Sequence, residues 1–139
     1  MAAMMDSSLT PTLIALAALG SGLGGMLRVW VVERVSRRWG DTFPWGTLVV
    51  NISGALLLGL LVGGAFALQD RTFTPAWLFL AIGLLGSYTT VSSFSLQTLS
   101  LWQARQAVPA LINVLASLTG CLLAIGLGFS LALLIGGAA

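Results

Sequence analysis

Long apolar stretches dominate this chain, and short polar segments separate them. Runs without any charged residue cover 7–27, 46–69, 72–104 and 106–139. Each run is long enough for the roughly 20 apolar residues with which an α-helix crosses the hydrocarbon core of a bilayer. The pattern predicts an all-α membrane protein with four transmembrane helices in a single domain over residues 1–139. The expected spans are about 10–39, 45–68, 75–103 and 107–135.

The composition supports a membrane protein and excludes several other classes. Of the 139 residues, 58% are hydrophobic and only 7% are charged, and the mean hydropathy is +1.01. These values lie far outside the range of soluble domains. The six arginines are too few for a nucleic-acid surface. Cys121 is the only cysteine, so no intrachain disulfide and no metal-ligand spacing is expected.

The arginines predict how the chain is oriented in the membrane. Four of them fall in the first and third connections, at about residues 33–44 and 103–107, whereas the second connection holds only Arg71. Connections rich in Arg usually face the cytoplasm, so both termini are expected outside it. We expect a multi-pass protein of the cell membrane.

Glycines mark faces on which helices can pack closely. Gly20, Gly22, Gly24 and Gly25 crowd the first expected helix, and Gly59 and Gly63 lie four residues apart in the second. Small residues of this kind let helix backbones approach each other within a membrane.

The segment "GLLGSYTTVSSFS" (83–95) places seven hydroxylated side chains among nine positions, 87–95, inside the third apolar run. Two glycines precede this cluster, and β-branched residues within it weaken helical structure. The pattern favours a third helix that is broken near the middle of the membrane. An intact helix, whose hydroxyls bond back to carbonyls of the preceding turn, is the alternative.

Further polar residues occur at helical spacing in two other expected helices. Thr47 and Asn51 share a face of the second helix, and Asn113 and Ser117 share a face of the fourth. The four apolar runs contain no acid, histidine or lysine, which excludes a proton relay or an acid–base pair, so an enzyme is not expected. Uncharged donors suit an anion that must bind and leave quickly. Phe94 can add its positive ring edge.

Three segments, "GGMLRVW" (24–30), "WGTLVVNISG" (45–54) and "GLLGSYTTVSSFS" (83–95), occur in this order on four short spans. In this the chain resembles the Fluc (CrcB) fluoride channels, whose third helix carries a signature close to G-G-x-T-T-F-S-T-F-S. The resemblance covers nearly the whole chain. It implies a fluoride-selective channel for passive efflux that lowers cytoplasmic fluoride, built as an antiparallel, dual-topology homodimer with a structural sodium ion (Na+) at its centre.

The resemblance also assigns roles to residues. Asn51 corresponds to the pore asparagine, Gly86 and Thr89 to the positions whose carbonyls hold sodium, and Arg28 to a structural arginine paired to backbone or headgroups. Together with the polar residues above, the candidate anion pathway comprises Thr47, Asn51, Thr90, Val91, Ser92, Ser93, Phe94, Asn113 and Ser117.

The departures from the family pattern keep alternatives open. Val91 replaces the first signature phenylalanine and has no ring edge to offer an anion. Ser87 replaces the second glycine, Gln97 stands where an acidic residue is common, and Asn113 stands where a tyrosine is usual. Because the arginines are unevenly distributed, the chain could instead pair with an oppositely oriented paralogous subunit. A small multidrug-type exporter and a non-conducting membrane subunit are further alternatives.

Overall fold

Helices form all the regular structure in the part of the chain that the structure describes. The computed structural model describes residues 9–67 and 74–136 and places no β-strand there. In chain order the elements are α1 (Leu9–Trp39), α2 (Trp45–Ala67), α3 (Pro75–Trp77), the π-helical η1 (Leu78–Leu85), α4 (Gly86–Tyr88), α5 (Val91–Gln103) and α6 (Ala107–Gly136). Elements α3 to α5 follow one another along a single span, Pro75–Gln103.

Four of the described helical stretches are long and apolar enough to cross a membrane: Pro11–Trp39, Trp45–Ala67, Pro75–Gln103 and Ala107–Gly136. This confirms the prediction of an all-helical protein with four membrane-spanning helices. The expected second span ended at residue 68, which lies outside the described residues.

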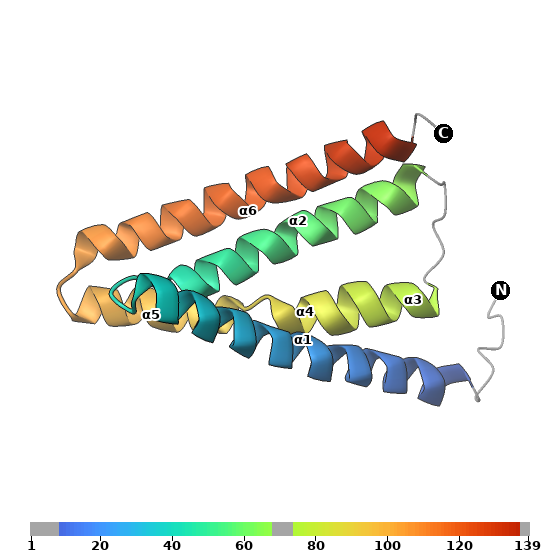
Figure 1. Ribbon diagram of the computed structural model, residues 1–139, viewed down its shortest axis with the longest axis horizontal. Helices are drawn as coiled ribbons and strands as arrows, with labels where there is room; N and C mark the ends of the chain where they lie inside the picture. The colour runs from blue at the N-terminus through green and yellow to red at the C-terminus, as the bar shows by residue number, and fades with distance from the viewer. Residues whose placement is uncertain (1–8, 68–73, 137–139) are drawn as a thin grey trace, which may run out of the picture.

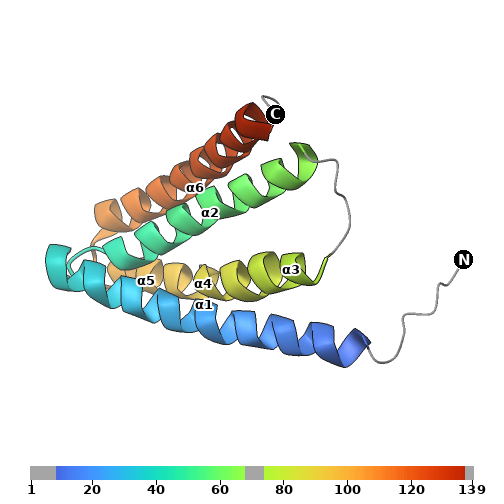
Figure 2. The same cartoon turned by 45° about the vertical axis from the view of Figure 1, so that its right-hand side comes forward.

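The spans form two neighbouring pairs (Figures 1 and 2). Helix α6 packs along α2, and both run in the same direction from one end of the bundle. Helix α1 packs along η1 and α4 and runs in the opposite direction to α2. The connections from α1 to α2 and from α5 to α6 therefore lie at the same end (Figure 1).

The buried core is small, and the outer surface is apolar. Val50, Leu85 and Tyr88 form the central buried cluster, whereas Leu123 and Leu134 on α6 are 74% and 72% exposed. Lipid tails are as apolar as leucine, so such side chains can face a bilayer without penalty. The helices must therefore be held together by close packing and by hydrogen bonds.

Glycine provides the close packing. An added Cβ at Gly24 would overlap the backbone of Leu84, and one at Gly59 would overlap the backbone of Ile125. Gly22 and Gly25 behave differently, because an added Cβ at either meets no described atom within 4 Å. The predicted packing face of the first helix is thus narrower than its cluster of glycines indicates.

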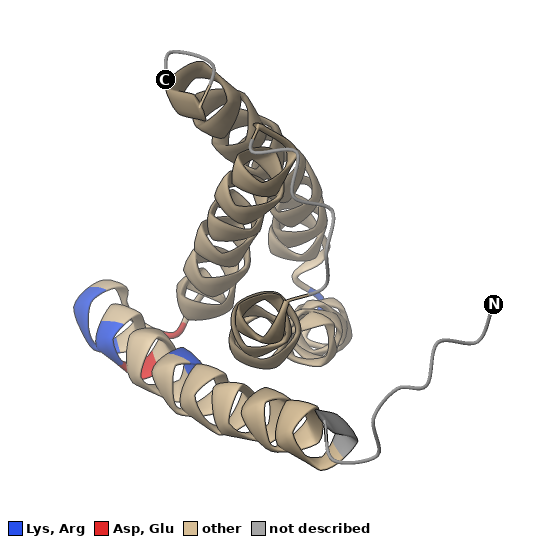
Figure 3. Cartoon of the chain, turned by 90° about the vertical axis from the view of Figure 1, so that its right-hand side faces the viewer, with Lys and Arg blue, Asp and Glu red and all other residues tan. Residues whose placement is uncertain are grey.

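The charged residues that the structure describes gather toward one end of the bundle (Figure 3). They belong to the second half of α1 and to the two connections at that end, and they are Arg28, Glu33, Arg34, Arg37, Arg38, Asp41 and Arg105. Asp6, Asp70 and Arg71 lie outside the described residues.

Replacement of Gly128 by alanine should destabilise the protein. Its added Cβ would overlap the carbonyl oxygen of Leu56 on α2, and overpacking of this kind typically costs about 1–3 kcal/mol. Thermal unfolding of the detergent-solubilised protein should show a lower midpoint for Gly128→Ala. The matched control is Gly126→Ala on the same helix, where an added Cβ meets nothing within 4 Å. Equal midpoints for the two variants would contradict this packing.

Candidate functional site

Two residues in the middle of the third span have extended backbone. Thr89 has φ −77° and ψ 158°, and Thr90 has φ −152° and ψ 119°, so helix α4 ends before them and α5 begins after them. The side-chain amide of Asn51 on α2 binds the backbone of Thr90. Its Nδ2 donates to the Thr90 carbonyl at 2.9 Å, and its Oδ1 accepts from the Thr90 N–H at 2.8 Å.

The extended segment changes where the neighbouring backbone groups bond. In an uninterrupted α-helix the N–H of Thr90 would donate to the carbonyl of Gly86, and that of Ser93 to the carbonyl of Thr89. Here Thr90 donates to Asn51, and Ser93 donates to the Thr90 hydroxyl at 3.2 Å. The carbonyls of Gly86 and Thr89 therefore lose the N–H partners that a continuous helix would give them.

The hydroxyls of the cluster form two kinds of hydrogen bond. The Thr90 side chain caps α5, and its Oγ1 lies 3.1 Å from the Oγ of Ser92 and 3.2 Å from the Oγ of Ser93. Other hydroxyls bond back to the preceding turn, as Thr89 does to the Leu85 carbonyl at 3.0 Å. The cluster thus contains one hydroxyl that caps the start of α5 and others that donate to carbonyls of the preceding helical turn.

A cavity of about 540 Å³ lies beside the extended segment. It brings together seven residues predicted from the sequence: Asn51, Gly86, Thr89, Thr90, Val91, Phe94 and Ser117. The Ser117 side chain is buried, whereas Val91 is 76% exposed. The cavity is mainly apolar, and its polar lining residues include Asn51, Thr89, Thr90 and Ser117.

The remaining predicted residues lie elsewhere. Asn113 is 2% exposed and donates to the Thr98 hydroxyl at 2.8 Å, so it links α6 to α5. Ser92 is exposed, and its described hydrogen bond is the one to Thr90. Thr47 and Ser93 line further cavities, toward the end of the bundle that carries the charges.

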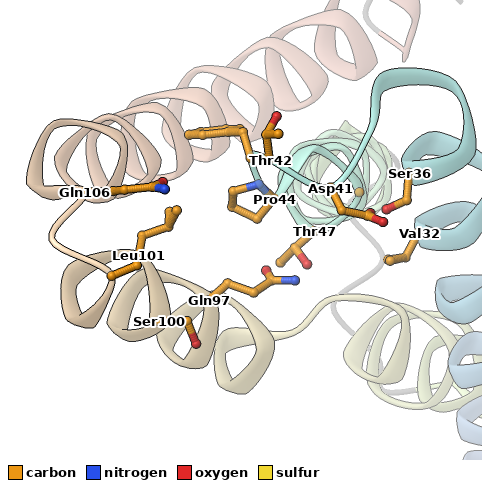
Figure 4. A pocket seen from close by; sticks show the side chains of 13 residues that line it. Val32, Ser36, Asp41, Thr42, Pro44, Thr47, Gln97, Ser100, Leu101 and Gln106 are labelled. Carbon is orange, nitrogen blue, oxygen red and sulfur yellow. The ribbon is translucent and has the colours of Figure 1, made fainter.

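Figure 4 shows one of these cavities, of about 380 Å³, where the loop after α1 and the start of α2 face α5. Thr47 and Gln97 face each other across it, and Asp41 lies near its rim (Figure 4). The Oε1 atom of Gln97 is buried without a hydrogen-bond partner. A second cavity, of about 400 Å³, shares Thr47 and Gln97 with the first and is also lined by Arg28.

Arg28 forms no hydrogen bond or ion pair with any described residue. Its expected pairing with backbone or lipid headgroups stays a prediction. The described ion pair is Arg37 with Glu33, at 2.6 Å. Arg28 instead borders the cavity that Thr90 and Ser93 also line.

Sequence reasoning missed three polar residues of the interior. Thr98 accepts the hydrogen bond of Asn113, and the hydroxyls of Ser53 and Tyr88 lie 2.9 Å apart. The contact between Ser53 and Tyr88 could not be predicted, because Ser53 lies two residues after Asn51 and therefore on a different face of the helix. Thr98 could have been found, because it lies four residues after Phe94 on the same helix face.

These features define a class of protein: a multi-pass membrane protein with uncharged hydrogen-bonding groups along its interior and an arginine at one side of them. Residues 15–129 match the model of a family described as "CrcB-like protein, Camphor Resistance (CrcB)". The chain belongs to this CrcB family. It is a protein of the cell membrane and not an enzyme.

Curated relatives cover most of the chain. A protein of Rhodopseudomonas palustris named "Fluoride-specific ion channel FluC 2" is 50% identical over 116 residues, which are 83% of this chain and 88% of the relative. One of the same name from Bradyrhizobium diazoefficiens is 47% identical over 86% of this chain and 88% of its own length. "Fluoride-specific ion channel FluC" of Paramagnetospirillum magneticum is 44% identical over 82% of this chain and 90% of its own length.

Removal of the Asn51 amide should open the extended segment. In Asn51→Leu both backbone groups of Thr90 lose their partner, and each buried group left unsatisfied costs about 1–3 kcal/mol. Hydrogen exchange of the Thr90 amide should therefore become faster. The control is Ser53→Ala, which removes a hydrogen bond between the same two spans and leaves the Thr90 partners intact. Unchanged Thr90 protection in Asn51→Leu would contradict the role assigned to Asn51.

Proposed function

We propose that this protein is a fluoride-selective ion channel that lets fluoride leave the cytoplasm passively. The observation that carries the proposal is the combination of close relatives named as fluoride-specific ion channels with an interior of neutral donors beside an extended backbone segment. Neutral donors can replace part of the hydration shell of a small anion without trapping it.

The proposed anion pathway uses different groups along its length. Thr47 and Ser93 lie toward the arginine-rich end, Thr90 lies at the extended segment, and Phe94 and Ser117 line the large cavity beyond it. Phe94 can direct its ring edge toward an anion. Val91 lines the same cavity but offers only methyl groups, so Phe94 is the one aromatic side chain among the described residues that line it.

An antiparallel dimer is part of the proposal. We place the extended segment near the middle of the bilayer, where irregular backbone persists only if protein or water covers it. Gly86 and Val91 are exposed on the face that carries the large cavity. A second subunit on this face would cover them and would complete the walls of the pathway.

A structural sodium ion at the dimer centre fits the chemistry of the extended segment. The carbonyls of Gly86 and Thr89 are deprived of their helical N–H partners because Asn51 and the Thr90 hydroxyl take those donors. Both residues line the cavity on the proposed dimer face. Oxygen ligands are those that hard cations prefer, and the same carbonyls from two subunits would supply four. Bound sodium would hold the subunits together.

The identity of the second subunit depends on membrane orientation. The described arginines lie toward one end of the bundle, which we propose faces the cytoplasm. An antiparallel homodimer requires insertion in both orientations, which such a bias opposes. An oppositely oriented, non-identical subunit is therefore the alternative to the homodimer.

Fluoride efflux from liposomes tests the proposed function. Vesicles containing only this purified protein and loaded with potassium fluoride should release fluoride rapidly to an electrode once a potassium ionophore lets potassium leave with it, while vesicles loaded with potassium chloride should not release chloride under the same conditions. This result is expected of a homodimer. If correctly folded and inserted protein released no fluoride, this would contradict a channel formed by this chain alone. Fluoride efflux that returns when a paralogue is coexpressed would support the heterodimer.

Sodium removal tests the proposed ion site separately. In buffers where N-methylglucamine replaces sodium, the thermal midpoint of the dimer should fall and efflux should decrease. A ligand present at 100 times its dissociation constant stabilises the folded state by about 2.7 kcal/mol. Added sodium should reverse both changes, and potassium at equal concentration serves as the control. Identical midpoints with and without sodium would exclude a structural sodium site.

A further inference from the structure

Tyr88 connects the short helix α4 to α2 by its side chain. Its hydroxyl lies 2.9 Å from the Oγ of Ser53. The Ser53 hydroxyl donates to the Val50 carbonyl at 3.2 Å, so its single hydrogen is already used and Tyr88 must be the donor to Ser53. Two hydrogen bonds in series therefore join Tyr88 to the backbone of α2.

The side chain of Tyr88 lies in the core and not in the large cavity. It is buried and packs in one cluster with Val50 and Leu85. The described lining of the cavity includes Gly86 and Thr89, on either side of Tyr88 in the chain, but not Tyr88 itself. The segment around α4 thus places one side chain in the core while its neighbours border the cavity.

The backbone around α4 has little rigidity of its own. The helix is three residues long, follows the π-helical η1 and is followed by the extended residue Thr89. A single helical turn gains few hydrogen bonds for the dihedral angles that it fixes. The place of the Gly86 carbonyl therefore depends on the contacts of α4 with other spans. Among the described residues of α4, Tyr88 is the one whose side chain hydrogen-bonds to another span.

Two attachments to α2 flank the carbonyls that we assign to sodium. After them, the N–H of Thr90 donates to Asn51 at 2.8 Å. A trans peptide directs its carbonyl opposite to its N–H, so this bond turns the Thr89 carbonyl away from Asn51. The Gly86 carbonyl belongs to α4, which Tyr88 attaches to the same helix. Each of the two carbonyls thus has its own attachment.

We infer that Tyr88 is a positioning residue of the proposed sodium site and fixes the Gly86 carbonyl through its hydrogen bond to Ser53. This inference rests on the proposed function, because it takes the sodium ion between two subunits as given. Tyr88 acts without touching the ion. A rigid set of oxygen ligands discriminates between cations of different size, so loss of the hydrogen bond should weaken sodium binding and reduce its advantage over potassium.

The test measures how much sodium the protein requires. Thermal midpoints of the detergent-solubilised dimer are recorded over a series of sodium concentrations, with N-methylglucamine keeping the ionic strength constant. Tyr88→Phe keeps the ring and removes the hydroxyl. The sodium concentration needed for a given rise above the sodium-free midpoint should increase about two- to tenfold, the factor that one hydrogen bond typically contributes.

A second measurement separates positioning from a general loss of stability. The same series is recorded with potassium, and the difference between the two cations should be smaller in Tyr88→Phe than in the wild type. A purely structural role would lower all midpoints and leave both the sodium requirement and the discrimination unchanged.

Ser53→Ala removes the acceptor and keeps both bonds of Asn51 to Thr90. It should increase the sodium requirement in the same direction, also where Tyr88→Phe fails to fold. The double variant should show less than the sum of the two single shifts, because both substitutions remove one bond. The matched control is Thr98→Val, which removes the acceptor of Asn113 between α5 and α6. It should lower the midpoints and keep the wild-type sodium requirement.

The outcomes distinguish this inference from the proposed function. A wild-type sodium requirement in both Tyr88→Phe and Ser53→Ala would overturn the role of Tyr88 and leave the sodium site intact. A wild-type midpoint that does not respond to sodium would overturn the site and the role of Tyr88 with it. Fluoride efflux, measured on the same preparations, reports separately whether the protein conducts.

Discussion

The interior of this protein depends on one side-chain amide that replaces two backbone partners. Asn51 gives the Thr90 peptide both a donor and an acceptor, at 2.9 and 2.8 Å. Without them, an extended residue inside a bundle of apolar helices would leave an N–H and a carbonyl unsatisfied, at a cost of about 1–3 kcal/mol each. The amide therefore makes the extended geometry of Thr89 and Thr90 compatible with burial.

The same face of α2 also provides the space for this geometry. Gly54 lies three residues after Asn51, and an added Cβ there would overlap the methyl group of Thr89. Helix α2 thus offers an amide to Thr90 and a bare backbone to Thr89. On the far side of the segment, the Thr90 hydroxyl caps α5. A helix end, an amide and a glycine together hold Thr89 and Thr90 in extended conformation, and the carbonyls of Gly86 and Thr89 lose their helical N–H partners.

Much of the fold could be predicted from the sequence, because charges are excluded from spans and the intervals between them give the number of helices. The polar residues on apolar helices were also visible, since Asn51, Thr90 and Asn113 have no reason to face lipid. Their partners were not visible. Asn51 and Thr90 are 39 residues apart, and no local pattern joins them. Likewise, Gly24 packs against the backbone of Leu84, whereas Gly22 contacts no neighbouring helix. Which of the two glycines makes the contact depends on how α1 is rotated about its axis, and the sequence does not give that rotation.

The surroundings of Arg28 could likewise not be predicted from the sequence. Its position near the end of an apolar run is typical of an arginine that reaches the headgroups. Only the packing of α1 against its neighbours places it beside Thr47, Thr90 and Gln97. The charge pattern along the chain predicts which end of the bundle is positive, whereas the three-dimensional arrangement decides which arginine borders the proposed pathway.

A series of substitutions at Asn51, namely Asn51→Asp, Asn51→Ser and Asn51→Leu, would test most directly whether this amide supports conduction by holding the backbone. For each variant, fluoride efflux from liposomes and hydrogen exchange at the Thr90 amide would be measured on the same preparation. If Asn51 acts through the extended segment, efflux falls in step with the loss of Thr90 protection across the series. Loss of efflux with native Thr90 protection would contradict this and would place Asn51 in direct contact with the anion instead.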